Sequence, residues 1–244
     1  MIRALVFDFD GLILETEEPI YREWEEIFGE HGQQLPGELY ASVLGTGCAS
    51  ASLFEALERL LGDPVEREAI TARRRDRERA AIEALRVRPG VISRLSEARA
   101  MGLRLAVASS STHAWVDGHL ARLGLGALWD CTVCREDVAP GRAKPAPDLY
   151  LRALGELEVG AVQAIAFEDS LHGVAAAKAA GLYCVAVPGP MTSRMDLGGA
   201  DLKLRSLAEM DLEEVIRRLT VRPPGSPLPQ EASGRPPGKS PSKL

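Results

Sequence analysis

Two aspartates, Asp8 and Asp10, follow directly on the apolar run Leu5-Val6-Phe7. A short apolar run is typical of a buried strand in a parallel sheet, and open α/β folds bind ligands beyond the carboxyl ends of such strands. Alternate residues of an extended chain point to the same side, so both carboxylates would face one site. An unpaired buried carboxylate costs several kcal/mol. The pair therefore predicts a hard divalent cation and, with it, phosphate chemistry.

Further polar residues stand at the ends of later strand-like runs, namely Ser109, Ser110, Lys144, Glu168 and Asp169. Taken singly, each has a structural explanation: serines and aspartates cap helices, and a lone lysine is usually exposed. Taken together and in chain order, they supply a phosphate clamp, a cation and a second acidic pair to accompany Asp8 and Asp10. This joint pattern favours a catalytic site over a set of unrelated helix caps.

Strand-like runs alternate with amphipathic helical patterns along most of the chain. The expected strands are Arg3–Phe7, Leu103–Ala108, Cys131–Cys134, Ala164–Phe167 and Cys184–Val187. Between them, sets such as Val116, Leu120 and Leu123 keep the spacing of one helix face. This alternation predicts an α/β fold, a doubly wound, Rossmann-like parallel sheet with right-handed crossovers.

One segment, residues 17–85, contains only helical patterns and interrupts this alternation. It predicts a helical module inserted after the first strand, which leaves 1–16 and 86–220 as the α/β core. The module would lie over the edge of the sheet that carries Asp8. For its arginine-rich run, Arg73 to Arg77, we predict a solvated helix face, and contact with an anionic substrate is the alternative. The tail, 221–244, is rich in Pro, Gly and Ser and is predicted to be disordered.

The composition excludes several classes of protein. The chain has 244 residues, 45% of them hydrophobic, and a net charge of −6, which gives no indication of nucleic-acid binding. No apolar stretch reaches the roughly 18 residues that a membrane helix needs. Four cysteines without a secretory signal predict free thiols in a cytoplasmic protein. Cys131 and Cys134 have metal-ligand spacing but no second ligand pair, so we interpret them as structural.

The motifs resemble those of a known family. Asp8-Phe9-Asp10-Gly11, Ser109, Lys144 and Glu168-Asp169 are similar to the four motifs of the haloacid dehalogenase-like superfamily, and the helical module resembles its small α-helical cap. The stretches Leu12–Glu17, Lys144–Asp148 and Phe167–Gly173 resemble the subgroup of β-phosphoglucomutases and small sugar-phosphate phosphatases. The resemblance covers residues 1 to about 219.

By this resemblance, Asp8 is the nucleophile that forms an aspartyl-phosphate, and Asp10 is the general acid and base. Ser109, Ser110 and Lys144 bind the transferring phosphoryl group. The resemblance also implies Mg²⁺, held by Asp8, the main-chain carbonyl of Asp10 and Asp169, with Glu168 acting through water. The expected partner is a small phosphorylated metabolite, and we expect a cytoplasmic monomer.

Three activities of the superfamily that this chain resembles, namely dehalogenation, mutase activity and phosphate hydrolysis, require different residues. Dehalogenases of the superfamily lack an aspartate at the position of Asp10, so its presence here disfavours dehalogenation. β-Phosphoglucomutases carry a histidine where this chain has Ile20 and a basic cap loop where it has Gly45–Ser50, and Glu15 replaces a more usual aspartate. Hydrolysis of a small phosphomonoester is therefore favoured, with a hexose-phosphate mutase as the alternative. A non-catalytic binding module is disfavoured because every motif residue is intact.

Overall fold

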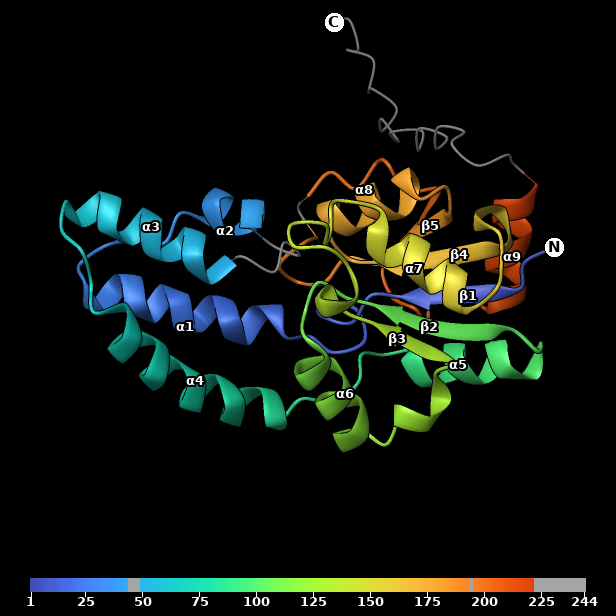
Figure 1. Cartoon of the computed structure of the whole chain (residues 1–244), viewed down its shortest axis with the longest axis horizontal. Coiled ribbons are helices and arrows are strands. Elements are labelled where there is room, and N and C mark those ends of the chain that lie inside the picture. Colours follow the sequence, from blue (N-terminus) through green and yellow to red (C-terminus); the bar gives the residue numbers. More distant parts are fainter. Residues whose placement is uncertain (44–48, 194, 222–244) are drawn as a thin grey trace, which may run out of the picture.

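The computed structural model describes residues 1–43, 49–193 and 195–221. Two segments from the sequence analysis lie outside the described residues. They are most of the loop Gly45–Ser50 and all of the predicted disordered tail except residue 221. The described part contains a parallel sheet in the strand order β3-β2-β1-β4-β5-β6 (Figure 1). Its strands are β1 (Ala4–Phe7), β2 (Arg104–Ala108), β3 (Cys131–Val133), β4 (Ala164–Glu168), β5 (Tyr183–Ala186) and β6 (Leu202–Lys203).

This sheet confirms the predicted doubly wound α/β fold, because its order is that of a Rossmann-type sheet. All five expected strands are present, within one or two residues of the predicted bounds. The sixth, β6, was not predicted: with two residues it is too short to show any alternation of apolar and polar side chains.

Helices cover both faces of the sheet (Figure 1). Alternate residues of β1 point to opposite faces, so Leu5 and Phe7 belong to one apolar cluster and Ala4 and Val6 to the other. The first cluster includes residues of α5 (Val91–Ala100), α6 (His113–Arg122) and α9 (Leu212–Thr220), and the second those of α7 (Asp148–Glu156) and α8 (Leu171–Ala179). Short 3₁₀ turns lie at Gly126–Leu128, Arg135–Asp137 and Ala161–Gln163.

Four helices lie between β1 and α5 in the chain and form a group beyond one end of the sheet (Figure 1). They are α1 (Glu17–Glu30), α2 (Gly37–Val43), α3 (Ala49–Leu61) and α4 (Arg67–Glu83). The group has a hydrophobic cluster of its own, in which the Trp24 and Phe54 rings meet edge to face with centroids 4.9 Å apart. None of the described helices has the length and apolarity that crossing a membrane requires.

Three cysteines are described, and they form no disulfide, as predicted. Cys131 lies in β3, and Cys134 follows that strand in the buried core. Burial raises the pKa of the Cys131 thiol to about 11 and that of Cys134 further, so both stay protonated at neutral pH. Protonated thiols are poor nucleophiles and poor metal ligands, which agrees with a structural role.

Candidate active site

The carboxyl ends of β1, β2 and β4 lie side by side. Phe7, the last residue of β1, pairs in register with Val107 of β2 on one side and with Phe167 of β4 on the other. The loops that leave these three strands therefore begin at nearly the same level. As a result, Asp8, Ser109 and Asp169 meet at one edge of the sheet although they are far apart in the sequence.

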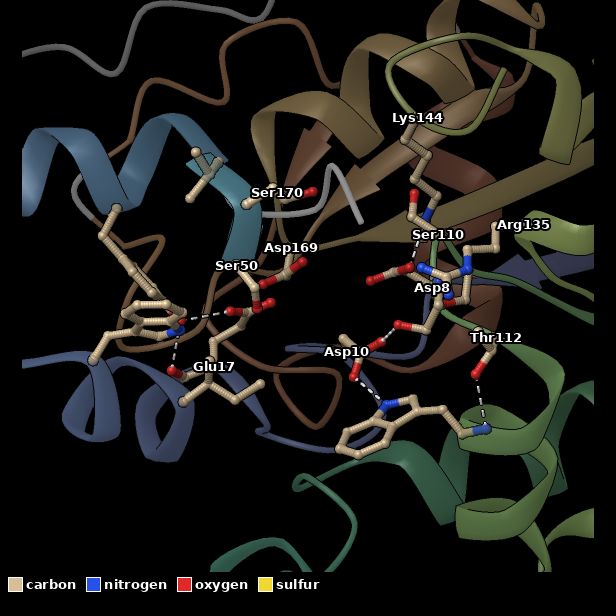
Figure 2. Close-up of a pocket in the computed structure, with 18 of the residues that line it drawn as sticks. Asp8, Asp10, Glu17, Ser50, Ser110, Thr112, Arg135, Lys144, Asp169 and Ser170 are labelled. Atoms are coloured by element: carbon tan, nitrogen blue, oxygen red, sulfur yellow. Dashed lines mark hydrogen bonds and ion pairs between the residues drawn. The ribbon is translucent and has the colours of Figure 1, made fainter. Parts of the chain in front are cut away.

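A cavity of about 620 Å³ lies over this edge, between the strand ends and helices α1 to α4 (Figure 2). Most residues that the sequence singled out line it, namely Asp8, Asp10, Ser109, Ser110, Lys144 and Asp169. Glu168 is the exception, because it is fully buried and does not line the cavity. The structure thus brings all seven together, six on the cavity wall and one behind it.

Lys144 joins the two acidic motifs. Its Nζ donates to Asp8 Oδ1 at 2.5 Å and to Glu168 Oε1 at 2.6 Å, and the side chain is 1% exposed. The other oxygen of Asp8, Oδ2, receives no hydrogen bond from the described residues. The ammonium therefore fixes the orientation of the Asp8 carboxylate and leaves one oxygen of it available.

Glu168 is held by four donors. Besides Lys144, the Tyr150 hydroxyl donates to Oε1 at 2.5 Å, and the Asp169 amide and Ser170 hydroxyl donate to Oε2 at 3.2 and 3.4 Å. A Cβ at Gly173 would overlap this carboxylate, so only glycine leaves room for it. Protein donors occupy both carboxylate oxygens of Glu168. These contacts hold the side chain in place, and through its bond to Nζ they fix the position of Lys144. The predicted action of Glu168 on a metal through water stays a prediction.

Among the described residues, the clustered acidic groups outnumber the one cation, Lys144, that forms ion pairs with them. Oxygens of Asp8, Glu168 and Asp169 lie within 4.8 Å of one another, and all three residues are buried. Burial, opposed by Lys144 and reinforced by Glu168, raises the pKa of Asp8 to about 8. Burial and the neighbouring carboxylates raise the pKa of Asp169 well above its usual range. Three carboxylates with a single ammonium leave excess negative charge, so the cluster fits a divalent cation.

Asp10 is oriented by three neutral donors. Thr16 Oγ1 and Trp115 Nε1 donate to its Oδ1 at 2.8 and 2.9 Å, and Ser111 Oγ donates to Oδ2 at 2.6 Å. Sequence reasoning did not identify these partners. Trp115 lies in the first turn of α6, which the Thr112 hydroxyl caps, so the serine cluster and the indole reach Asp10 from the same segment.

Replacing Trp115 with Phe should lower kcat/KM by about tenfold, since a hydrogen bond to a charged group contributes about 1.5–3 kcal/mol. Phenylalanine keeps an aromatic ring but lacks the donor that holds Asp10. The measurement is steady-state hydrolysis of an aryl phosphate, with thermal unfolding to show that the variant is folded. A matched control is Trp129→Phe, because the Trp129 indole N–H has no partner among the described residues. Equal losses in both variants would contradict the role of the Trp115 donor.

The serine cluster leaves one buried hydroxyl without a partner. Ser109 Oγ accepts from the Ser111 amide at 3.0 Å, whereas Ser110 Oγ has no hydrogen-bond partner among the described residues. Ser110 is only 6% exposed and lines the cavity. An unpaired buried hydroxyl is costly, so a group that accepts its hydrogen bond would be stabilised there.

The wall of the cavity opposite the sheet includes residues of α1 and α2 that sequence reasoning did not single out. Tyr40 donates to a carboxylate oxygen of Glu17 at 3.1 Å, and burial raises the pKa of Glu17 to about 8. Trp24 is fully buried, lines the cavity and has an indole N–H without a partner in the described part of the chain. This wall therefore offers donors and acceptors to the part of a ligand that lies away from Asp8.

The arginine-rich run divides between two faces of α4 and is mostly solvated, as predicted, because Arg73, Arg75 and Arg77 are exposed and only Arg74 is half-buried. Arg73 and Arg77 lie within 3.5 and 3.1 Å of Glu30 and Glu26 of α1. Arg74 and Arg75 instead line the cavity. The helical period, which turns adjacent residues by about 100°, explains the division.

Comparison with known proteins shows the family of the chain. The family model described as haloacid dehalogenase-like hydrolase matches residues 2–181. The chain is 42% identical to the Bacillus subtilis protein YhcW over 219 residues, which are 90% of this chain and 98% of YhcW. It is 30% identical to the phosphorylated carbohydrates phosphatase of Thermotoga maritima, over 89% of this chain and 98% of that one.

A solved structure is also similar to this chain in sequence and fold. The chain matches crystalline CbbY of Rhodobacter sphaeroides, in complex with xylulose-(1,5)bisphosphate, with a TM-score of 0.68 and 34% identity. The match covers 86% of this chain and 96% of that one.

Proposed function

The chain belongs to the haloacid dehalogenase-like hydrolase family, and from this premise we propose that it is a phosphatase acting on a small organic phosphomonoester. One observation carries the proposal. The Asp8 carboxylate, held by Lys144, lies beside an acidic cluster and an unpaired Ser110 hydroxyl at the base of a cavity. The residues that we propose as nucleophile and phosphate ligands thus line one pocket, with Glu168 of the acidic cluster behind its wall.

The reaction takes place in two steps. An oxygen of Asp8 attacks phosphorus in line and the ester bond breaks, which leaves an aspartyl-phosphate and an alkoxide that takes a proton from Asp10. Asp10 then removes a proton from water, whose oxygen attacks the same phosphorus and releases inorganic phosphate and free Asp8. Asp8 Oδ2 is suited to the attack because Lys144 occupies Oδ1.

Charge on the transferring group needs fixed partners. The Lys144 ammonium and the Ser109 and Ser110 segment are suited to bind the phosphoryl oxygens, because positioning and charge neutralisation supply most of the catalysis in phosphoryl transfer. Asp8, the Asp10 carbonyl and Asp169 would hold Mg²⁺, with Glu168 behind them. When bound, Mg²⁺ would neutralise the acidic cluster and orient the phosphate.

For the substrate we propose a sugar phosphate. The Thermotoga relative is named for phosphorylated carbohydrates, and CbbY is crystallised with a sugar bisphosphate. In this chain, the Glu17 carboxylate, the Trp24 indole N–H and the Tyr40 hydroxyl lie on the wall opposite Asp8 and match the hydroxyl groups of a sugar. Helices α1 to α4, the predicted module 17–85, would act as a substrate-selecting cap over the core.

The test is a panel of sugar, polyol and nucleoside monophosphates incubated with the protein and Mg²⁺, with inorganic phosphate measured. We expect release from at least one sugar phosphate, and its loss on chelation of the metal with EDTA. Isomer interconversion without net phosphate release, in the presence of a sugar bisphosphate primer, would instead identify a mutase. No turnover of any panel member or of an aryl phosphate would overturn the proposal.

A further inference from the structure

A second cavity, of about 460 Å³, lies beside the catalytic one, between α4 and α6. Figure 1 shows the end of α4 close to α6, and Arg122 of α6 donates to the main-chain carbonyls of Ile82 and Glu83 at that end. Three residues, Arg74, Arg75 and Trp115, line both cavities. The second cavity, here called the α4–α6 groove, is therefore contiguous with the space above Asp8.

The groove is strongly basic. Four arginines line it, namely Arg74, Arg75, Arg79 and Arg122, against the single carboxylate Glu83. Arg75 and Arg79 form no ion pair or hydrogen bond with the described residues, in contrast to Arg73 and Arg77 of the same helix, which pair with α1. Of the three α4 arginines that line the groove, Arg75 and Arg79 are thus without a partner in the described part of the chain, whereas Arg74 donates to Ser50.

The spacing of Arg75 and Arg79 suits a single anion bound between them. Arg75 and Arg79 are four residues apart, which places them on one helix face about 6 Å apart along the axis. Arg75 stands at the junction of the two cavities, and Arg79 lines only the groove. A group bound by both would lie beside the catalytic cavity, within reach of a substrate whose ester phosphate is at Asp8.

The opposite wall leaves room for such a group. Ala114 and Gly118 of α6 are small, and Trp115 and His119 pack edge to face with ring centroids 4.5 Å apart. Burial lowers the pKa of His119, so its ring is neutral at neutral pH and adds no charge. Arg122 is fixed by the carbonyls at the end of α4 while its cation still faces the groove.

We propose that the α4–α6 groove binds a second phosphate of the substrate, so that this enzyme prefers small sugars or polyols phosphorylated at two positions. Arginine guanidinium groups bind phosphate through paired, charge-assisted hydrogen bonds, which an unpaired arginine in a hollow can form. The inference rests on the proposed phosphatase function for the position of the first phosphate. It adds a subsite that the catalytic motifs do not contain.

The test compares a bisphosphate with its monophosphate as competitors of p-nitrophenyl phosphate hydrolysis. Fructose 1,6-bisphosphate should inhibit at least about tenfold more strongly than fructose 6-phosphate, because it alone can place a phosphate in each subsite. Arg79→Gln should remove most of this difference. The matched control is Arg77→Gln, which removes the same charge from the other face of α4 and should leave the difference and the basal activity unchanged.

Equal inhibition of the wild-type protein by the bisphosphate and the monophosphate would overturn the subsite. Equal effects of Arg77→Gln and Arg79→Gln would also overturn it, since a general loss of positive charge would then explain the result. If neither p-nitrophenyl phosphate nor any member of the panel of monophosphates is hydrolysed, the proposed phosphatase function fails instead. Calorimetric titration of both fructose phosphates into wild type, Arg77→Gln and Arg79→Gln then tests the groove separately. We expect the bisphosphate to bind more tightly than the monophosphate in wild type and Arg77→Gln, and most of this difference to be lost in Arg79→Gln. Equal affinities in wild type, or equal effects of the two substitutions, would overturn the subsite.

Discussion

Asp8→Asn should lower kcat by at least about 10⁴-fold, because it replaces the attacking carboxylate with a neutral amide that cannot form the aspartyl-phosphate. The amide has nearly the same shape and still accepts the hydrogen bond from Lys144. The pocket and the phosphate ligands therefore remain in place. The measurement is release of inorganic phosphate from the best substrate, with Asp63→Asn, an exposed aspartate between α3 and α4, as the control.

The same variant should be at least as stable as wild type when no metal is present. Burial raises the pKa of Asp8 to about 8, which means that the folded protein disfavours the charged form. A neutral Asn removes one of the carboxylates that share a single ammonium. Activity and stability should thus change in opposite directions. Residual turnover near the wild-type rate would eliminate Asp8 as the nucleophile.

Lys144→Met should lower the free energy of unfolding by about 3–5 kcal/mol, since removing one member of a buried ion pair leaves its partners uncompensated. Lys144 is 3% exposed and lies between Asp8 and Glu168. These carboxylates raise the pKa of Lys144 above its usual value. The contribution of the ammonium is therefore complete at neutral pH and is lost only as the pH rises through this raised, strongly alkaline pKa.

Chemical denaturation in EDTA measures this loss, with Lys203→Met, an exposed lysine of β6, as the control. A second variant covers the case in which Lys144→Met does not fold. In Lys144→Met/Glu168→Gln, one of the two carboxylates is neutral and Tyr150 can still donate to the amide oxygen. This double variant should be more stable than Lys144→Met alone. If it is less stable, the destabilisation does not come from uncompensated charge.

Local patterns were sufficient to predict five of the six described strands and the positions of the polar motif residues that follow them. The apolar runs are continuous because each strand is covered on both faces, and such runs are visible in a single sequence. Parallel pairing then places all strand ends at one edge, so the meeting of Asp8, Ser109 and Asp169 follows from the fold class alone.

Contacts that depend on tertiary packing could not be predicted in the same way. Trp115 reaches Asp10 only because α6 packs beside the first loop, and no sequence spacing encodes that distance. The charge run of α4 is solvated as its composition predicts, but which of its arginines pair with α1 and which line the cavity depends on how the helix packs. The anchoring contacts of Glu168 likewise depend on Tyr150, a residue of the neighbouring helix α7.

The position of β1 has a consequence for folding. β1 is the first strand in the chain, yet it lies between β2 and β4, which begin at Arg104 and Ala164. Its pairings are therefore of high contact order and should form slowly. Until they form, an apolar strand remains unpaired and prone to aggregate. Since Asp169 follows β4, recovery of activity during refolding should report the completed sheet rather than the earlier collapse of the chain.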